Sequence, residues 1–338
     1  MDFLLQSIEF QPKELSFKRL ENKLSHTLSK VQKQRFREVQ SLLAEHKVYQ
    51  AYACLKAHLS RQRKDSFAQY LAGRIALVCG DFQLSQSHLS QAYFHATKDS
   101  ELSKHCFISL AKTFINSRQL DRCQSLLLEQ ERHNPCFELY AISGFYHQKV
   151  KQFTRSVVAY ETALKLNPNA YLVRLSLIKL MIHQDQIDKA QHEISKLKQA
   201  RVKHPDFYAV NAIISHKPQR DQLAFIKKAL KLERKHGLSL LLLGDYYLNH
   251  KPKLAIKYYS MALEDHKSFF IIYKKLAEAL ALEHRYEEAI AQLLMYRCFV
   301  SESKHVKVQH DIALLHEKQK KHEKKLLQYS KKSWWKVF

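Results

Sequence analysis

Glycine and proline are scarce in this sequence: the chain of 338 residues contains 5 Gly and 6 Pro. Most tight turns need one of these residues, so the shortage argues against a fold of many short strands and favours long helices. It also leaves too few glycines for the loops that bind phosphates or present a catalytic serine. The motifs G-x-x-x-x-G-K, G-x-G-x-x-G and G-x-S-x-G do not occur.

Long apolar runs are also missing. The longest, Leu238–Leu243, is interrupted by Ser239 and is far shorter than the roughly 18 residues that a membrane-spanning helix needs. The first residues contain Asp2 and no basic segment, so they do not resemble a secretory signal. We therefore expect a cytoplasmic chain. A hydrophobic content of 46% predicts a packed core rather than disorder.

The sequence has little that could bind a metal or perform catalysis. Its six cysteines form no C-x-x-C pair, so buried free thiols in a reducing cytoplasm are expected rather than disulfides or metal ligands. His316 and His322 lie six residues apart, which places them on helix faces that diverge by about 240°. We predict no catalytic residues, no metal site and no cofactor, and hence no enzyme.

Positive charge is abundant. Lys and Arg number 56 against 32 Asp and Glu, which gives a net charge of +24. Such a chain attracts an acidic protein segment, nucleic acid or an anionic membrane surface, and charge alone does not choose among them. The last residues, from His316 on, are rich in lysine and include Trp334, Trp335 and Phe338. We interpret them as a capping helix, with membrane or nucleic-acid contact as the alternatives.

One stretch, residues 137–169, shows how the rest of the chain is organised. Its pattern predicts two helices with a break near Lys151 and a stop at Pro168. Small residues on the facing sides, Gly144, Ser156 and Ala163, let the two backbones approach closely. The larger Tyr140, Phe153 and Tyr160 fill the space beside them.

This spacing resembles the tetratricopeptide repeat (TPR), whose period is about 34 residues. It recurs most clearly in residues 73–92, 110–135, 243–262 and 276–296. The resemblance implies an all-α fold, a right-handed superhelical solenoid of about nine TPR-like helix pairs, in which each pair buries its apolar face against the next. We assign residues 32–303 to the solenoid and 304–338 to a basic C-terminal capping helix pair, with helices over residues 306–318 and 320–332.

Residues 1–31 do not fit the repeat. Asp2–Phe3 and the run from Pro12 to Leu15 resemble the C-terminal end of a response-regulator receiver domain, as found in bacterial receiver–TPR proteins. The receiver's Lys-Pro pair is missing, because Gln6 and Ser7 stand in its place. The resemblance implies a role in bacterial two-component signalling. The alternative is an ordinary helix that caps the solenoid.

In TPR proteins the first helix of each pair lines a concave groove, and the resemblance places nine residues there. A row of cations with interleaved aromatic residues suits an extended acidic peptide or a terminal carboxylate. The alternative is that these charges are merely solvated. Asp245 and Glu278 occupy the equivalent position further on, so a basic channel does not run the whole length. The predicted groove residues are Tyr70, Arg74, Ile108, Lys112, Asn116, Phe145, Lys149, Lys179 and His183.

The sequence therefore predicts a non-catalytic protein–protein interaction scaffold that binds a peptide or helix of a partner protein in this groove. The competing hypothesis is a basic helical-repeat protein that associates with RNA or DNA.

Overall fold

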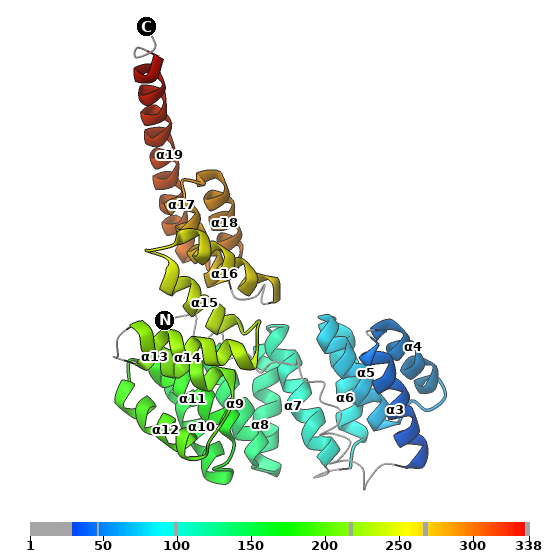
Figure 1. Cartoon of the computed structure of the whole chain (residues 1–338). Coiled ribbons are helices and arrows are strands. Elements are labelled where there is room, and N and C mark those ends of the chain that lie inside the picture. The colour runs from blue at the N-terminus through cyan, green and yellow to red at the C-terminus, as the bar shows by residue number, and fades with distance from the viewer. Residues whose placement is uncertain (1–28, 46, 98–100, 216–218, 266–269, 335–338) are drawn as a thin grey trace. The chain divides into compact units, whose positions relative to one another are not determined.

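The computed structural model describes residues 29–45, 47–97, 101–215, 219–265 and 270–334 (Figure 1). Within these ranges the chain forms seventeen α-helices and one short 3-10 helix, and no strand. Its described residues divide into two compact units. We refer to their described parts, residues 29–174 and 175–334, as the first and second units.

The first unit contains four antiparallel helix pairs, and its helices keep the labels of Figure 1. They are α3 (Lys30–Ala44), α4 (Val48–Leu59), α5 (Ser66–Cys79), α6 (Phe82–His95), α7 (Glu101–Asn116), α8 (Leu120–His133), α9 (Phe137–Lys149) and α10 (Phe153–Leu166). Each helix packs against the next, and the first helices α5, α7 and α9 also contact one another in order. This is the arrangement of a helical-pair solenoid.

The helix α11 (Tyr171–His183) spans the division, and the remaining helices belong to the second unit. They are α12 (Ile187–Gln199), α13 (Pro205–Ile214), α14 (Gln219–Leu232), α15 (Gly237–Tyr247), α16 (Pro252–Asp265), α17 (Ile271–Leu282), α18 (Tyr286–Phe299), the 3-10 helix η1 (Glu302–Lys304) and α19 (His305–Trp334). In the described residues the pairs from α3/α4 to α17/α18 number eight, and α19 follows them. The predicted all-α solenoid of about nine TPR-like pairs is confirmed.

Helix caps and turns explain where the helices begin and end. Asp65 caps α5 by accepting hydrogen bonds from the backbone N–H groups of Phe67 and Ala68. Gly80 then ends α5 in the left-handed conformation, with φ of 80°. The corresponding turns of later pairs have non-glycine residues in the same conformation, among them Lys151 with φ of 61°. A chain with five glycines therefore builds some of its turns from residues for which this conformation is strained.

The predicted close approach of α9 and α10 is confirmed. The Ser156 hydroxyl donates a 2.7 Å hydrogen bond to the Gly144 carbonyl oxygen. Ser156, Tyr160 and Ala163 are fully buried. A Cβ atom at Gly144 would lie 2.5 Å from two ring carbons of Tyr160, so only glycine fits. Gly244 faces Tyr259 in the same way in the second unit.

The predicted helix pair over residues 306–318 and 320–332 is wrong, because α19 is one continuous helix from His305 to Trp334. Lys318, Gln319 and Lys320 favour a helix, and no glycine or proline interrupts it. The first half of α19 packs against α18 and buries Val308 and Leu315.

All six cysteines are free thiols. Burial raises the pKa of both Cys106 and Cys123 to about 12, as expected for inert core thiols. The expectation of burial is wrong for Cys79 and Cys298, which are exposed. In the part of the chain that the structure describes, no helix is long and apolar enough to cross a membrane.

Residues 1–28 lie outside the described residues. The receiver-domain resemblance and the alternative N-terminal cap both fall there, and they stay predictions.

Candidate functional site

The first unit brings Tyr70 and Arg74 together on one face of α5. Arg74 Nη1 donates a 2.7 Å hydrogen bond to Tyr70 Oη, and the guanidinium carbon lies 5.8 Å from the centre of the Tyr70 ring. Tyr70 is fully buried and Arg74 is half-buried. The buried phenol therefore fixes the position of a guanidinium group that remains partly accessible.

Lys112 on α7 is the neighbour of Arg74 from the next pair. Burial, and secondarily the positive charge of Arg74, lowers the pKa of Lys112 to about 7. The helices α5 and α7 are in contact, so the two cations belong to adjacent helices of one unit. We call these residues the Arg74–Lys112 pair. An anion beside it would favour the charged form of Lys112 and raise its pKa.

Hydrogen bonds between facing helices fix the register of the next repeat. The Cys123 thiol donates to the Ala111 carbonyl at 3.8 Å, and Ser156 donates to Gly144, in each case twelve residues earlier. Phe145 therefore occupies on α9 the position that Lys112 occupies on α7. The exposed ammonium group of Lys149, one turn later, lies 5.1 Å from the centre of the Phe145 ring.

The predicted open aromatic surface is wrong. Tyr70 is 0% and Phe145 is 4% exposed, because first helices pack against neighbours on both sides and leave little room for an uncovered ring. On α7, Ile108 precedes Lys112 by one turn and is half-buried, whereas Asn116 follows it by one turn and is exposed. The accessible chemistry of this surface is therefore cationic and polar.

Lys179 does not offer a charge to solvent, which corrects its assignment to the groove. It is 2% exposed, and its ammonium group lies 2.7 Å from Asp206 Oδ1. The same oxygen lies 3.1 Å from Nε2 of His236, which is also buried. Burial by itself raises the pKa of Asp206, but Lys179 and His236 outweigh it and hold that pKa well below its usual range.

This network joins the first helices of three successive pairs, because Lys179 is on α11, Asp206 is the second residue of α13 and His236 precedes α15. Asp206 and His236 were missed at the level of sequence. Asp206 directly after Pro205 marks the first turn of a helix, but nothing in the sequence assigns its partners. His183 lies one turn after Lys179 and is half-buried.

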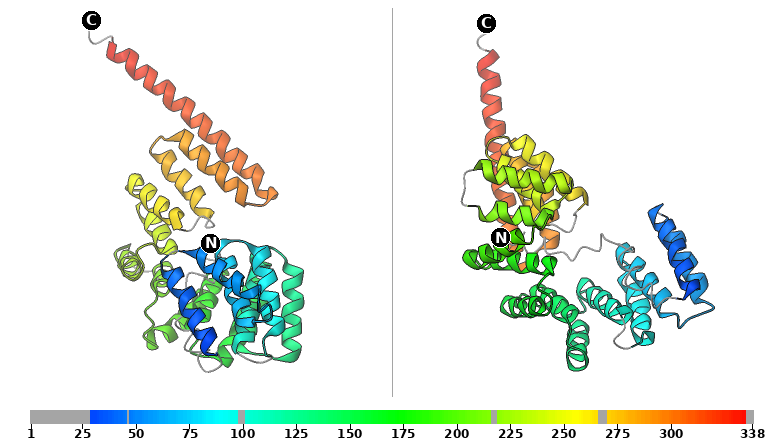
Figure 2. Two further views of the ribbon diagram at one scale, coloured as in Figure 1. Left: turned by 90° about the vertical axis from the view of Figure 1, so that its right-hand side faces the viewer. Right: turned by 60° about the horizontal axis from the view of Figure 1, so that its bottom comes forward.

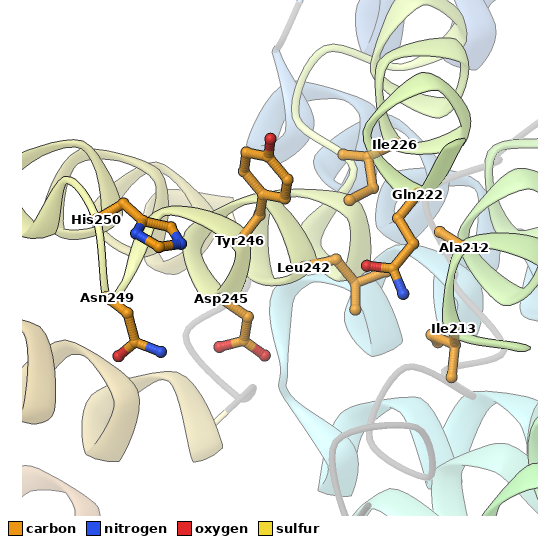
Figure 3. Close-up of a pocket in the computed structure, with 9 residues that line it drawn as sticks. All are labelled: Ala212, Ile213, Gln222, Ile226, Leu242, Asp245, Tyr246, Asn249 and His250. Atoms are coloured by element: carbon orange, nitrogen blue, oxygen red, sulfur yellow. The ribbon is translucent and has the colours of Figure 1, made fainter. Parts of the chain in front are cut away.

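A cavity of about 340 Å³ lies among α13, α14 and α15 (Figure 3). The helix α13 has ten residues, fewer than any other described α-helix, and ends beside it. Figure 3 shows Asp245 and Asn249 pointing to the same side, with Gln222 reaching in from α14. Asp245 Oδ1 accepts a hydrogen bond from Tyr259 and lies 3.2 Å from Lys275 Nζ. The negative charge at this groove position is therefore already paired.

Within the described ranges, no group of three or more His, Cys, Asp or Glu side chains could bind a metal ion. Among the described residues, the features available for recognition include the Arg74–Lys112 pair with Lys149 in the first unit and the cavity beside Asp245 in the second.

Part of the chain matches a known repeat family. Residues 149–214 match the family of the tetratricopeptide repeat. No curated protein matches the chain in sequence.

Three solved structures share the fold. A chain of the APC/C hetero-tetramer Cut9–Hcn1 is 14% identical with a TM-score of 0.61, and the match covers 94% of this chain and 63% of that one. A TPR protein from Parabacteroides merdae is 14% identical with a TM-score of 0.58, over 75% and 100% of the two chains. Yeast Tom70 is 13% identical with a TM-score of 0.54, over 82% and 60%. The chain thus spans less than two thirds of the first and third structures.

Proposed function

We propose that this chain, a tetratricopeptide repeat protein by its match over residues 149–214 and by its fold, is a non-catalytic scaffold that binds an acidic segment of a partner protein at the Arg74–Lys112 pair. The TPR fold itself supports a role in protein–protein interaction. The finer assignment rests on one observation, which is the close placement of two half-buried cations on adjacent first helices.

The two cations have different roles in this proposal. Arg74 is oriented by Tyr70 and presents a planar guanidinium group that matches a carboxylate. Lys112 contributes a positive charge, and a bound anion reduces the free-energy cost of keeping that charge partly buried. Lys149 lies one repeat further along and extends the positive surface for an elongated acidic segment.

The test compares two variants with equal changes of charge. Arg74→Gln with Lys112→Met removes both cations of the pair and retains most of their volume. Lys56→Gln with Lys165→Met removes two exposed lysines on the second helices α4 and α10. Binding of a fluorescent acidic peptide is measured by anisotropy. We expect the first variant to raise Kd at least tenfold and the second to change it less than twofold.

Equal affinities for the two variants would contradict the proposal, because the peptide would then respond to net charge alone. Circular dichroism of both variants checks that the helices are intact. Lys112→Met removes a partly buried charge, so we expect no loss of stability from that substitution.

The net charge of +24 supports a second candidate, association with RNA or DNA. Contacts to phosphates release counterions, so affinity for a nucleic acid falls linearly on a plot of log affinity against log salt. A steep slope for duplex DNA or single-stranded RNA, together with failure of the acidic peptide to compete, would favour this candidate over the peptide site.

A further inference from the structure

A cavity of about 710 Å³ opens in the first unit, where α3 begins, α4 ends and α5 begins. Figure 2 shows α3, in dark blue, as the outermost described helix of this unit, so no further described helix pair stacks on that side. Four cationic side chains line the cavity. They are Arg35 of α3 and Arg61, Arg63 and Lys64 of the loop that joins α4 to α5. We call this site the α3–α5 cavity.

Asp65 also lines the cavity, but its carboxylate does not neutralise these cations, because both oxygens are already bonded within the protein. Its Oδ1 accepts hydrogen bonds from the backbone N–H groups of Phe67 and Ala68, at 3.1 Å each. The same oxygen accepts a 3.2 Å hydrogen bond from the amide of Gln32. Its Oδ2 lies 2.8 Å from Nε2 of His58, and both side chains of this contact are buried. The negative charge of Asp65 therefore belongs to the wall of the cavity.

The four cations lack a counter-charge in the part of the chain that the structure describes, where none of them forms an ion pair. Arg61, Arg63 and Lys64 are exposed and close in sequence, so their charges repel one another. Arg35 is half-buried, and its Nη1 atom is buried without a hydrogen-bond partner among the same described residues. A buried donor without an acceptor costs free energy, and a ligand that supplies the acceptor removes that cost.

The helix ends make a smaller contribution to the positive potential. The N-termini of α3 and α5 both lie at this cavity, and the N-terminus of an α-helix carries a partial positive charge. N–H groups at both ends are capped, by Ser29 and by Asp65, so these ends contribute potential rather than hydrogen bonds. The C-terminus of α4 has the opposite sign and offsets one of them. Hydrogen bonds to a ligand therefore have to come from the cationic side chains.

An anion with more than one charge and several acceptor oxygens fits this cavity best. A phosphate monoester carries a charge of about −1.5 to −2 at pH 7 and has three strong acceptor oxygens, which arginine binds in a bidentate manner. A carboxylate has a single charge and two oxygens, so it neutralises fewer of the four cations. A nucleobase needs an aromatic surface, and the described residues that line the cavity include no Phe, Tyr or Trp.

We propose that the α3–α5 cavity binds a phosphate monoester, carried either by a side chain of a partner protein or by a small phosphorylated molecule. Arg35 donates a hydrogen bond from Nη1 to a phosphate oxygen, and the cations of the loop neutralise the remaining charge. This site is separate from the Arg74–Lys112 pair, because Arg74 lies nine residues, or about 14 Å, beyond Asp65 along α5.

Two probes distinguish the two sources of the phosphate. The first is a peptide library with phosphoserine fixed at its centre and random residues around it, and a library with serine at the centre is its control. Capture of the peptides by the immobilised full chain is quantified by mass spectrometry. The second probe is phenyl phosphate, whose Kd is measured by titration calorimetry. All proteins carry Arg74→Gln and Lys112→Met, so the proposed acidic-peptide site does not contribute and failure of either proposal is seen separately.

The loop cations are tested with two variants that change the charge equally. Arg61→Gln with Lys64→Gln removes two exposed cations of the cavity. Arg155→Gln with Lys165→Gln is the matched control, because it removes an exposed arginine and an exposed lysine from α10, in the last helix pair of the first unit. We expect the loop variant to raise the Kd of the bound monoester at least tenfold, which corresponds to about 1.4 kcal/mol, and the control to raise it less than twofold.

The buried contact is tested with Arg35→Met. Without ligand, this variant should melt at the same temperature as its parent or higher, because it removes a buried donor that has no acceptor among the described residues. A saturating monoester should raise the melting temperature of the parent and leave that of the variant unchanged. Circular dichroism checks that the helices of the variant are intact, and the loop variant tests the cavity without this substitution. Unchanged binding to a folded Arg35→Met variant would contradict the proposal.

Capture of the phosphoserine library assigns the phosphate to a partner protein, and binding of phenyl phosphate alone assigns it to a small molecule. The proposal is overturned if neither probe binds, if the serine library is captured equally well, or if the loop variant and its control bind alike. It is also overturned if a short single-stranded RNA displaces the bound probe at a lower concentration than the unlabelled probe does, because the cavity would then belong to a nucleic-acid surface.

Discussion

Replacement of Gly144 by alanine tests the packing of the repeat most sharply. The new Cβ atom would lie 2.5 Å from Cδ1 and Cε1 of Tyr160. Carbon atoms in contact are normally about 3.5–4.0 Å apart, so the ring or the helix must move by about 1 Å. Overpacking of this kind costs about 1–3 kcal/mol. Alanine recovers up to about 1 kcal/mol through its higher helix propensity, so we expect a net loss of about 1–2 kcal/mol.

The sign of this effect should reverse when the ring is removed. Tyr160→Ala alone costs about 3–5 kcal/mol, because Tyr160 is fully buried. In that background Gly144→Ala has space for its methyl group and should stabilise the chain by up to about 1 kcal/mol. Urea unfolding of the four proteins of this double-mutant cycle, followed by circular dichroism, gives the coupling energy. Additive effects, or stabilisation by Gly144→Ala in the natural background, would refute the proposed register of α9 and α10.

Three further predictions concern a turn, a buried charge and the binding pair. Lys151→Gly should stabilise the chain by about 0.5–1 kcal/mol, since it relieves a left-handed non-glycine residue; a lower melting temperature would contradict this. Asp206→Asn should cost about 3 kcal/mol, because the buried ammonium group of Lys179 loses its counter-charge. The pKa of Asp206 is lowered in the folded chain, so the stability that its carboxylate provides should be lost as pH falls below about 4. The melting temperature of the Asp206→Asn variant should not show this decrease. Affinity for the acidic peptide should fall as pH rises above about 7, where Lys112 loses its proton in the free chain, and Lys112→Arg should remove this dependence in an anisotropy titration.

The repeat fold could be predicted because its signals are local. Gly144, Ser156 and Tyr160 lie within one helix pair, and their contacts follow from the helical period and a short turn. The same local reasoning failed between Lys318 and Lys320. A break was predicted there so that the helices would remain in pairs, but the residues themselves favour a continuous helix.

The candidate site could be predicted only in part, because accessibility depends on neighbouring repeats. Arg74 and Lys112 were placed on adjacent first helices by the repeat register, as the structure has them. No local pattern indicates that Lys179 is neutralised by Asp206, 27 residues later, or that Tyr70 and Phe145 are covered. Such burial is decided by how successive pairs stack, and a single repeat does not encode it.

Capture from a nuclease-treated lysate of the native cell tests the central claim most directly. The natural chain and the variant with Arg74→Gln and Lys112→Met are compared side by side by quantitative mass spectrometry. The account predicts at least one stoichiometric protein that the natural chain retains after nuclease treatment and the variant loses by at least tenfold. Identical protein partners on both chains, or material that disappears with nuclease, would contradict it.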